Sequence, residues 1–247
     1  MTTLNWIIVS GLLMSSIALV GSFTLLLRPL ILEKLLLLLV VFAAGALFSV
    51  AFFHMIPASF KANLSIVIII VWIVCGFTTC LAIERFLYWH HNHQLLIKHK
   101  ELLTYMSLIG DGLHNFLGGM AIAGTFIIDT RLGIFCWLAV AAHEVPKELK
   151  DFTVLTHGGW SKGLALFFNL LSGLTFLIGG LIAYILSFKF DVSWVIPFAA
   201  GNFIYIGMSG LVTKINKNTG ANLKSIMLTA SAFILGVYLF VLAIPHS

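Results

Sequence analysis

The sequence predicts an all-α polytopic membrane protein, and three observations indicate this fold class. Hydrophobic residues make up 60% of the 247-residue chain and charged residues only 9%, whereas soluble domains average about 25% charged residues. The mean hydropathy is +1.08. Apolar stretches of about 20 residues, long enough to cross a bilayer, follow one another with short polar connections. We therefore expect one transmembrane domain over residues 1–247, embedded in a lipid bilayer.

Eight apolar stretches are predicted to be transmembrane helices. The first follows only five residues and has no basic segment before it, so it is predicted to be retained rather than cleaved as a signal peptide. The longest polar connection, WHHNHQLLIKHKE at about 89–101, separates the third stretch from the fourth. The predicted spans are about 5–27, 32–56, 65–88, 102–127, 132–156, 161–187, 193–213 and 224–244.

The Lys and Arg residues of the connections predict the orientation of the chain. Nine lie in the connections after the first, third, fifth and seventh spans, and three lie on the opposite side. The richer side is expected to be cytoplasmic, which places both termini on the non-cytoplasmic side. The nine are Arg28, Lys34, Arg85, Lys98, Lys100, Lys162, Lys214, Lys217 and Lys224, and the three are Lys61, Arg131 and Lys189.

Composition and missing motifs exclude several classes of function. The net charge of +5 is spread over short loops, so no nucleic-acid partner is expected. Cys75, Cys80 and Cys136 lie in apolar segments and indicate no disulfide framework. No phosphate-binding loop is present, so ATP is not the direct energy source. An HExxH motif is also missing, because Lys147 stands at its second His, and we expect no enzyme activity.

Polar residues inside the fourth and fifth predicted spans are the feature of this sequence that indicates a functional site. An Asp or Lys at the centre of a span costs about 2.5–3.5 kcal/mol, so such a residue is expected to face a cavity, a partner or an ion. Helical spacing puts these residues on one face of each span. The faces comprise Asp111, His114, Asn115 and Gly118 in the fourth span, and His143, Glu144, Lys147, Glu148 and Asp151 in the fifth.

Imidazole and carboxylate groups on facing helices suit Zn²⁺ and its first-row neighbours. His114 and His143 would supply nitrogen, and Glu144 would supply oxygen, with Glu148 or Asp111 as further carboxylates and Asn115 as a weak carbonyl ligand. Pro146 cannot donate to the carbonyl of Ala142, which is then free to bind an ion or water. The alternative is a buried network of salt bridges and hydrogen bonds that only fixes packing. Similarly, His54 taken alone is typical of a hydrogen bond between helices.

Five segments resemble the ZIP (Zrt/Irt-like) family of divalent-metal transporters. GDGLHNFLGGMAIAGTF resembles the fourth-helix motif, a His-Asn pair followed by an acidic residue and Gly. HEVPKELKDF resembles the fifth-helix motif, usually His-Glu-x-Pro-His-Glu-x-Gly-Asp-Phe. AAGALFSVAFFHMIP, ERFLYWHHNH and PFAAGNFIYIG are similar to parts of the second, third and seventh helices. The resemblance covers about residues 43–210.

This resemblance implies eight helices with both ends outside and a transport site between helices four and five that can hold two metal ions. It assigns His114 and Asn115 of helix four, and His143 and Glu144 of helix five, as ligands. Glu148 and Asp151 match further polar positions of the motif. His54 matches a second-helix His on the path of the ion.

The chain departs from the family pattern along that path. Gly118 replaces an Asp or Glu, and Lys147 replaces the His or Glu expected to bridge two ions. Two unit charges 4 Å apart interact by about 4 kcal/mol at an effective dielectric of 20, so a second metal needs carboxylates that are missing here. We therefore predict one metal ion, with Lys147 as a tethered cation paired with Glu144, Glu148 or Asp151. Further departures are Lys150 for Gly, Val50 and Ala58 in helix two, and Gly210 and Lys214 in helix seven.

Lys147 also admits a second interpretation, as a buried amine that releases its proton and couples proton movement to metal passage. In the 89–101 connection, His90, His91 and His93 either capture metal or lie at the membrane interface with the neighbouring aromatic residues.

The sequence predicts transport of a divalent first-row metal, zinc above all, toward the cytoplasm. The alternative is a transport-incompetent ZIP-like partner subunit or metal sensor, which the missing acids favour. The short loops are typical of a multi-pass protein of the cell membrane, either bacterial inner or plasma membrane. Small residues such as Gly173, Gly179 and Gly180 permit close helix contact and a homodimer.

Overall fold

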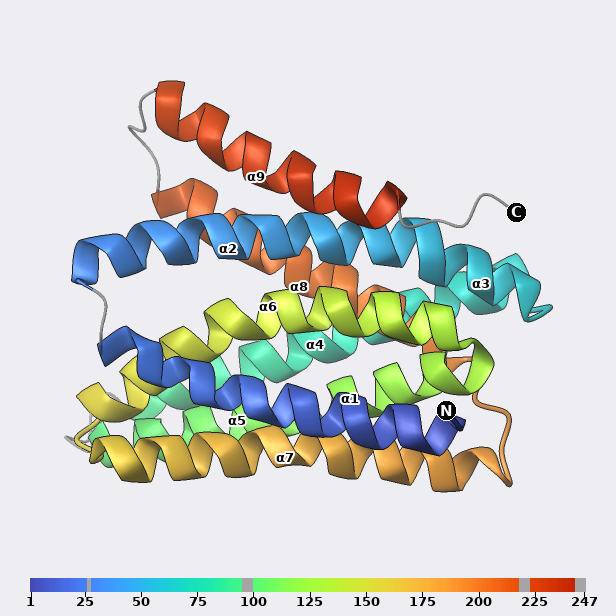
Figure 1. The fold of residues 1–247 in the computed structure, drawn as a ribbon, viewed down its shortest axis with the longest axis horizontal. Helices are drawn as coiled ribbons and strands as arrows, with labels where there is room; N and C mark the ends of the chain where they lie inside the picture. The colour runs from blue at the N-terminus through green and yellow to red at the C-terminus, as the bar shows by residue number, and fades with distance from the viewer. Residues whose placement is uncertain (26–27, 95–99, 218–222, 243–247) are drawn as a thin grey trace.

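The computed structural model describes residues 1–25, 28–94, 100–217 and 223–242, which are almost entirely helical (Figure 1). Because the 3-10 segment η1 continues α1, and the π-helical segment η2 and α3 continue α2, these residues form eight helical rods. The all-α prediction is confirmed. The elements are α1 (Thr3–Ile17), η1 (Ala18–Leu25), α2 (Pro29–Ser49), η2 (Val50–Met55), α3 (Ile56–Lys61), α4 (Ile66–Gln94), α5 (Lys100–Ile128), α6 (Thr130–His157), α7 (Lys162–Ser187), α8 (Val195–Lys217) and α9 (Leu223–Leu242).

Four stretches of the described chain are long and apolar enough to cross a membrane: Thr3–Leu25, Leu30–Lys61, Ile66–Phe86 and Lys162–Ser187. Two shorter apolar helices, Val195–Leu211 and Ile226–Leu242, accompany them. The helices α5 and α6 are not among these because the polar residues on them lower their hydropathy. Together the apolar helices indicate a multi-pass membrane protein, while the number of crossings stays a prediction.

The rods pack in two groups. In the first group α7 lies along α5 and α1, and α6 packs against α5 and η1. In the second group α2 lies along α9 and α8, and α4 packs against α8. Figure 1 shows α7 and α5 at one side of the molecule and α9 at the other, with α6 beside α2 between them. The two groups meet mainly where α6 contacts α2 and α5 contacts α8.

Apolar and polar residues occupy opposite ends of the α5–α6 pair. Ile122 and Phe126 of α5 and Cys136 and Ala139 of α6 belong to the main hydrophobic core, which extends through both groups. These residues flank the connection between α5 and α6. The polar stripes begin further from that connection, toward the first residues of α5 and the last residues of α6. Among the buried side chains of the pair, those near the connection are therefore largely apolar, and the charged ones lie further from it.

The helix that starts at Pro29 changes to a π-helical turn before Pro57. Pro57 has no N–H to donate to the carbonyl of Phe53, and the N–H of Ile56 reaches back five residues to the carbonyl of Ala51. Such wide turns within an α-helix occur often at functional positions. Here the turn carries His54, which is 9% exposed.

The connection predicted at 89–101 begins later in the structure, because α4 continues to Gln94. The backbone at His90, His91 and His93 is therefore helical. Their side chains lie outside the described part of the structure, so both interpretations of this segment stay predictions.

Replacing Phe152 with Ala should destabilise the fold. Phe152 is fully buried beside Leu155 and Ala165, and losing a buried Phe side chain costs about 3 kcal/mol. Phe167→Ala is the matched control, since Phe167 is 60% exposed and its loss should cost less than about 0.5 kcal/mol. Denaturant unfolding in detergent micelles measures both variants, and equal free energies of unfolding would contradict the packing described.

Candidate metal centre

A one-residue connection brings the two polar stripes together. Asp129 alone links α5 to α6, and its side chain caps α6 by accepting the N–H of Leu132 at 2.7 Å. Because the two helices run back along each other, residues equally distant from Asp129 lie at the same level. His114 lies 15 residues before Asp129, and Glu144 lies 15 residues after it. The pairing of His114 with Glu144 is thus implied by their spacing in the sequence, but it can be recognised only once the one-residue connection at Asp129 is known.

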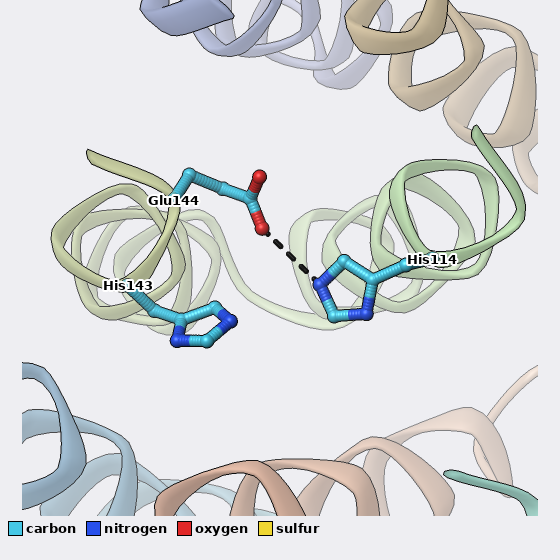
Figure 2. Close-up of side chains that lie close together, drawn as sticks. All are labelled: His114, His143 and Glu144. Carbon is cyan, nitrogen blue, oxygen red and sulfur yellow. Dashed lines mark hydrogen bonds and ion pairs between the residues drawn. The ribbon is translucent and has the colours of Figure 1, made fainter. Parts of the chain in front are cut away.

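His114, His143 and Glu144 form a set of side chains that could hold a metal ion. One ligand atom from each lies within 4.8 Å of the others. His114 Nε2 is 3.1 Å from Glu144 Oε1, and the two imidazole ring centres are 5.8 Å apart. Figure 2 shows His114 coming from α5 and the other two from α6. Two imidazoles and one carboxylate make a ligand set suited to zinc and other first-row divalent ions.

Lys147 lies beside this set, one helical turn along α6. Its Nζ forms ion pairs with Asp111 Oδ1 and with Glu144 Oε2, the latter at 3.0 Å. The predicted pairing with Glu144 is therefore present, whereas the ion pair with Asp111 was not expected. Asp111 and Lys147 each lie 18 residues from Asp129, so the α5–α6 register explains this contact. Glu144 offers one oxygen to His114 and the other to Lys147.

Asp111 is held by three neighbours. Besides the ammonium of Lys147, the hydroxyl of Ser172 on α7 and the Nδ2 of Asn115, at 3.2 Å, donate to it. Asn115, predicted as a weak carbonyl ligand, is 2% exposed and directs its amide N–H to Asp111. Its contact in the structure is therefore with a neighbouring carboxylate of the same helix.

Glu148 belongs to a second group of acidic side chains. One oxygen each from Asp111, Glu144 and Glu148 lie within 4.8 Å of one another. The carboxylate of Glu148 also accepts from Nδ2 of Asn169 on α7. Glu148 is thus close to Glu144 and Asp111, on the side of the site where Lys147 supplies the positive charge.

The other predicted residues lie around or away from this centre. Asp151 is partly buried and lines a small pocket with Asp111, Ser107 and Asn169. His54 Nε2 donates to the carbonyl of Phe240 at 2.8 Å. That carbonyl lies in the last described turn of α9, where backbone carbonyls lack partners within the helix. In this structure His54 thus makes the bond between helices that its isolated position suggested.

The contributions of α7 were not predicted from the sequence. Asn169 and Ser172 are both buried, and they donate to Glu148 and Asp111. Their spacing of three residues puts them on one face of α7, which is the available sequence signal. It is a weak one, because Ser and Asn often form such bonds in membrane helices without any ligand nearby.

These features define the class of the protein: an all-helical, multi-pass membrane protein whose helices α5 and α6 bring imidazole and carboxylate groups together. A family model described as "ZIP Zinc transporter" matches residues 89–243. This match covers more than half of the chain, and the chain belongs to the ZIP zinc transporter family, a family of transporters rather than enzymes.

Curated relatives agree with this assignment. The chain is 36% identical over 126 residues to zinc transporter zipt-7.2 of Caenorhabditis elegans, covering 48% of this chain and 27% of that protein. It is 35% identical over 115 residues to metal cation symporter ZIP14 of Homo sapiens, covering 47% and 23%. It is 39% identical over 115 residues to zinc transporter foi of Drosophila melanogaster, covering 46% and 16%. The matches thus span about a quarter or less of these relatives.

Removing the ammonium of Lys147 should destabilise the metal-free protein. Lys147→Met leaves Asp111 and Glu144 buried without their cation, and breaking one side of a buried ion pair costs about 3 kcal/mol. The second change Asp111→Asn should restore part of the loss. The free energy of unfolding, measured in detergent with a chelator present, reports the effect.

The matched control for this prediction is Lys150→Met on the same helix. Lys150 is exposed, so its replacement should change the free energy of unfolding by less than about 0.5 kcal/mol. A Lys147→Met protein as stable as the unmodified chain would show that the ion pairs do not contribute as described.

Proposed function

We propose that this chain transports a divalent first-row metal ion, zinc above all, toward the cytoplasm through a site between α5 and α6. The observation that carries the proposal is the set of His114, His143 and Glu144, whose ligand atoms lie within 4.8 Å of one another. Buried polar groups are costly in a membrane protein unless they serve a partner or an ion. The names of the relatives, which refer to zinc and metal cations, support zinc as the cargo.

We propose further that the site holds one ion at a time. Counted as ionised, Asp111, Glu144 and Glu148 carry three negative charges and Lys147 one positive charge, a formal balance of −2. One divalent ion neutralises this balance, whereas a second would leave a buried excess of positive charge, which a low-dielectric environment disfavours. Gly118 adds no carboxylate on the α5 side. In this arrangement Lys147 substitutes for the second ion.

We infer the direction of transport from the position of the charged side chains and from the predicted orientation of the chain. The charged end of the α5–α6 pair lies toward the start of α5 and the end of α6. The Lys and Arg residues of the connections predict that this end faces the cytoplasm and that both termini face the other side. The polar groups that lead away from the metal centre, including Asp151, therefore lie on the predicted cytoplasmic side in a cell membrane.

A partner subunit or metal sensor that does not transport is the second candidate. It is favoured by the ion pairs that Lys147 makes with Asp111 and Glu144, since a fixed cation occupies carboxylates that would otherwise carry an ion onward. This candidate predicts zinc binding without uptake, so one set of measurements separates the two functions.

Purified protein in liposomes should take up zinc when the outside solution contains it. We expect uptake from a panel of zinc, manganese, iron(II) and cobalt, with zinc fastest, and none of magnesium, because the two imidazoles favour first-row transition metals. His143→Ala should reduce zinc uptake at least about tenfold, since it removes a ligand. The control is His157→Ala, which replaces an exposed histidine and should leave zinc uptake unchanged. Equal uptake by the His143→Ala protein would reject the site, and zinc binding without uptake would favour the sensor.

Replacing Lys147 with His should create a second metal position. The unmodified chain should bind one zinc ion, and Lys147→His should bind two, because an imidazole replaces the ammonium between two carboxylates. Calorimetry and metal analysis of the purified protein measure the stoichiometry, with Lys150→His as the control that stays at one. Two zinc ions in the unmodified chain would show that Lys147 does not substitute for an ion.

A further inference from the structure

The helices α5 and α7 touch through a reciprocal pair of glycines. A Cβ added to Gly119 of α5 would overlap the carbonyl oxygen of Phe176 on α7, and a Cβ added to Gly179 of α7 would overlap that of Phe116 on α5. The contact is symmetric: Gly119 faces the residue three positions before Gly179, and Gly179 faces the residue three positions before Gly119. Only hydrogen in place of a side chain permits this approach, which brings Cα–H groups against carbonyl oxygens.

This contact lies close to the metal centre. Gly119 follows His114 by five residues, about 7.5 Å along a helix axis. Just beyond His114, as seen from Gly119, the hydroxyl of Thr175 on α7 donates to the carbonyl of Gly112 on α5 at 2.7 Å. Further along the same two helices, Ser172 donates to Asp111. The close approach therefore determines whether the polar face of α7 reaches the carboxylates of the site.

We propose that Gly119 and Gly179 are positioning residues for the metal site, acting by holding α7 close enough for Ser172 to reach Asp111. Asp111 in turn binds Lys147, which contacts Glu144. Spreading α5 and α7 would release Asp111 and shift Lys147 toward Glu144, the carboxylate that the metal needs. The inference rests on the proposed function, because it assumes that the site binds a metal ion.

Equivalent glycine pairs elsewhere in the chain provide matched controls. Gly45 of α2 and Gly236 of α9 face each other in the same reciprocal way, against the backbones of Phe233 and Phe42. Figure 1 shows α9 on the opposite side of the molecule from α7. Substitution at Gly236 should therefore disturb helix packing as much as substitution at Gly119, without touching the side chains around Asp111.

The test compares zinc affinity and thermal stability in Gly119→Ala, Gly179→Ala and Gly236→Ala proteins purified in detergent. We expect all three to lower the melting temperature. Gly119→Ala and Gly179→Ala should also weaken zinc binding about tenfold, the effect of removing a partner that orients a ligand. Gly236→Ala should leave zinc affinity within about twofold, as expected for a distant and independent site.

A milder variant covers the case in which the glycine substitutions prevent folding. Thr175→Val keeps the side-chain shape but removes the bond to Gly112, so it loosens the same helix pair. It should weaken zinc binding about threefold, less than the loss of a direct orienting partner. Thr153→Val is its control, because within the described residues the Thr153 hydroxyl donates to the carbonyl of Leu149 on its own helix, and its loss should not change zinc affinity.

The outcomes separate this inference from the proposed function. An unmodified chain that binds no zinc overturns both. Zinc binding by the unmodified chain, together with equal affinities in the Gly119→Ala and Gly236→Ala proteins, overturns only the positioning role. If the glycine variants do not fold, unchanged zinc affinity in Thr175→Val overturns it instead.

Discussion

The balance of charge around Lys147 is the constraint on which the site depends. An ammonium inside a membrane-spanning region is tolerated only beside negative charge, and Asp111 and Glu144 supply that charge from two different helices. Glu144 is shared, with one oxygen toward Lys147 and the other toward His114. A metal ion and the ammonium can therefore use the same carboxylate through separate oxygens, so that the fixed cation lowers the negative charge of the site without occupying its ligand position.

The connection at Asp129 sets which residues of α5 and α6 face one another. Because one residue joins α5 to α6, apolar residues near it pack into a closed end, and polar residues at equal distances from it face one another further away. The ion pairs of Lys147 then lie away from the connection, whose own charged side chains, Asp129 and Arg131, are exposed. The site therefore lies beside packed apolar side chains toward Asp129 and beside further polar side chains on the other side. The ribbons of α1 and α7 lie on the Glu144 side of this pair in Figure 2.

The helix α7 shows how a largely apolar span can organise a polar site. Asn169 donates both to Glu148 and to the carbonyl of Ala18 in η1, and thus joins three segments of the first helix group. Gly173, Gly179 and Gly180, which suggested a contact between two copies, instead lie against Ser15, Phe116 and Ile7 of the same chain. Their small size serves packing within the chain, so a homodimer, if it forms, would have to use other surfaces.

The sequence by itself determined the membrane class, the helical fold, the two polar stripes and the choice of His114, His143 and Glu144 as candidate metal ligands. Composition and helical periodicity are local properties, so they can be read from the sequence without knowing which helices pack together. Only the tertiary structure decided that Lys147 pairs with Asp111, that Asn115 turns to the same carboxylate, and that Asn169 and Ser172 of α7 take part. Asn115 and Asp111 are four residues apart on one helix, but Ser172 and Lys147 fix the position of that carboxylate. The contacts between helices depend on which helices approach one another and how closely, and no local pattern records this.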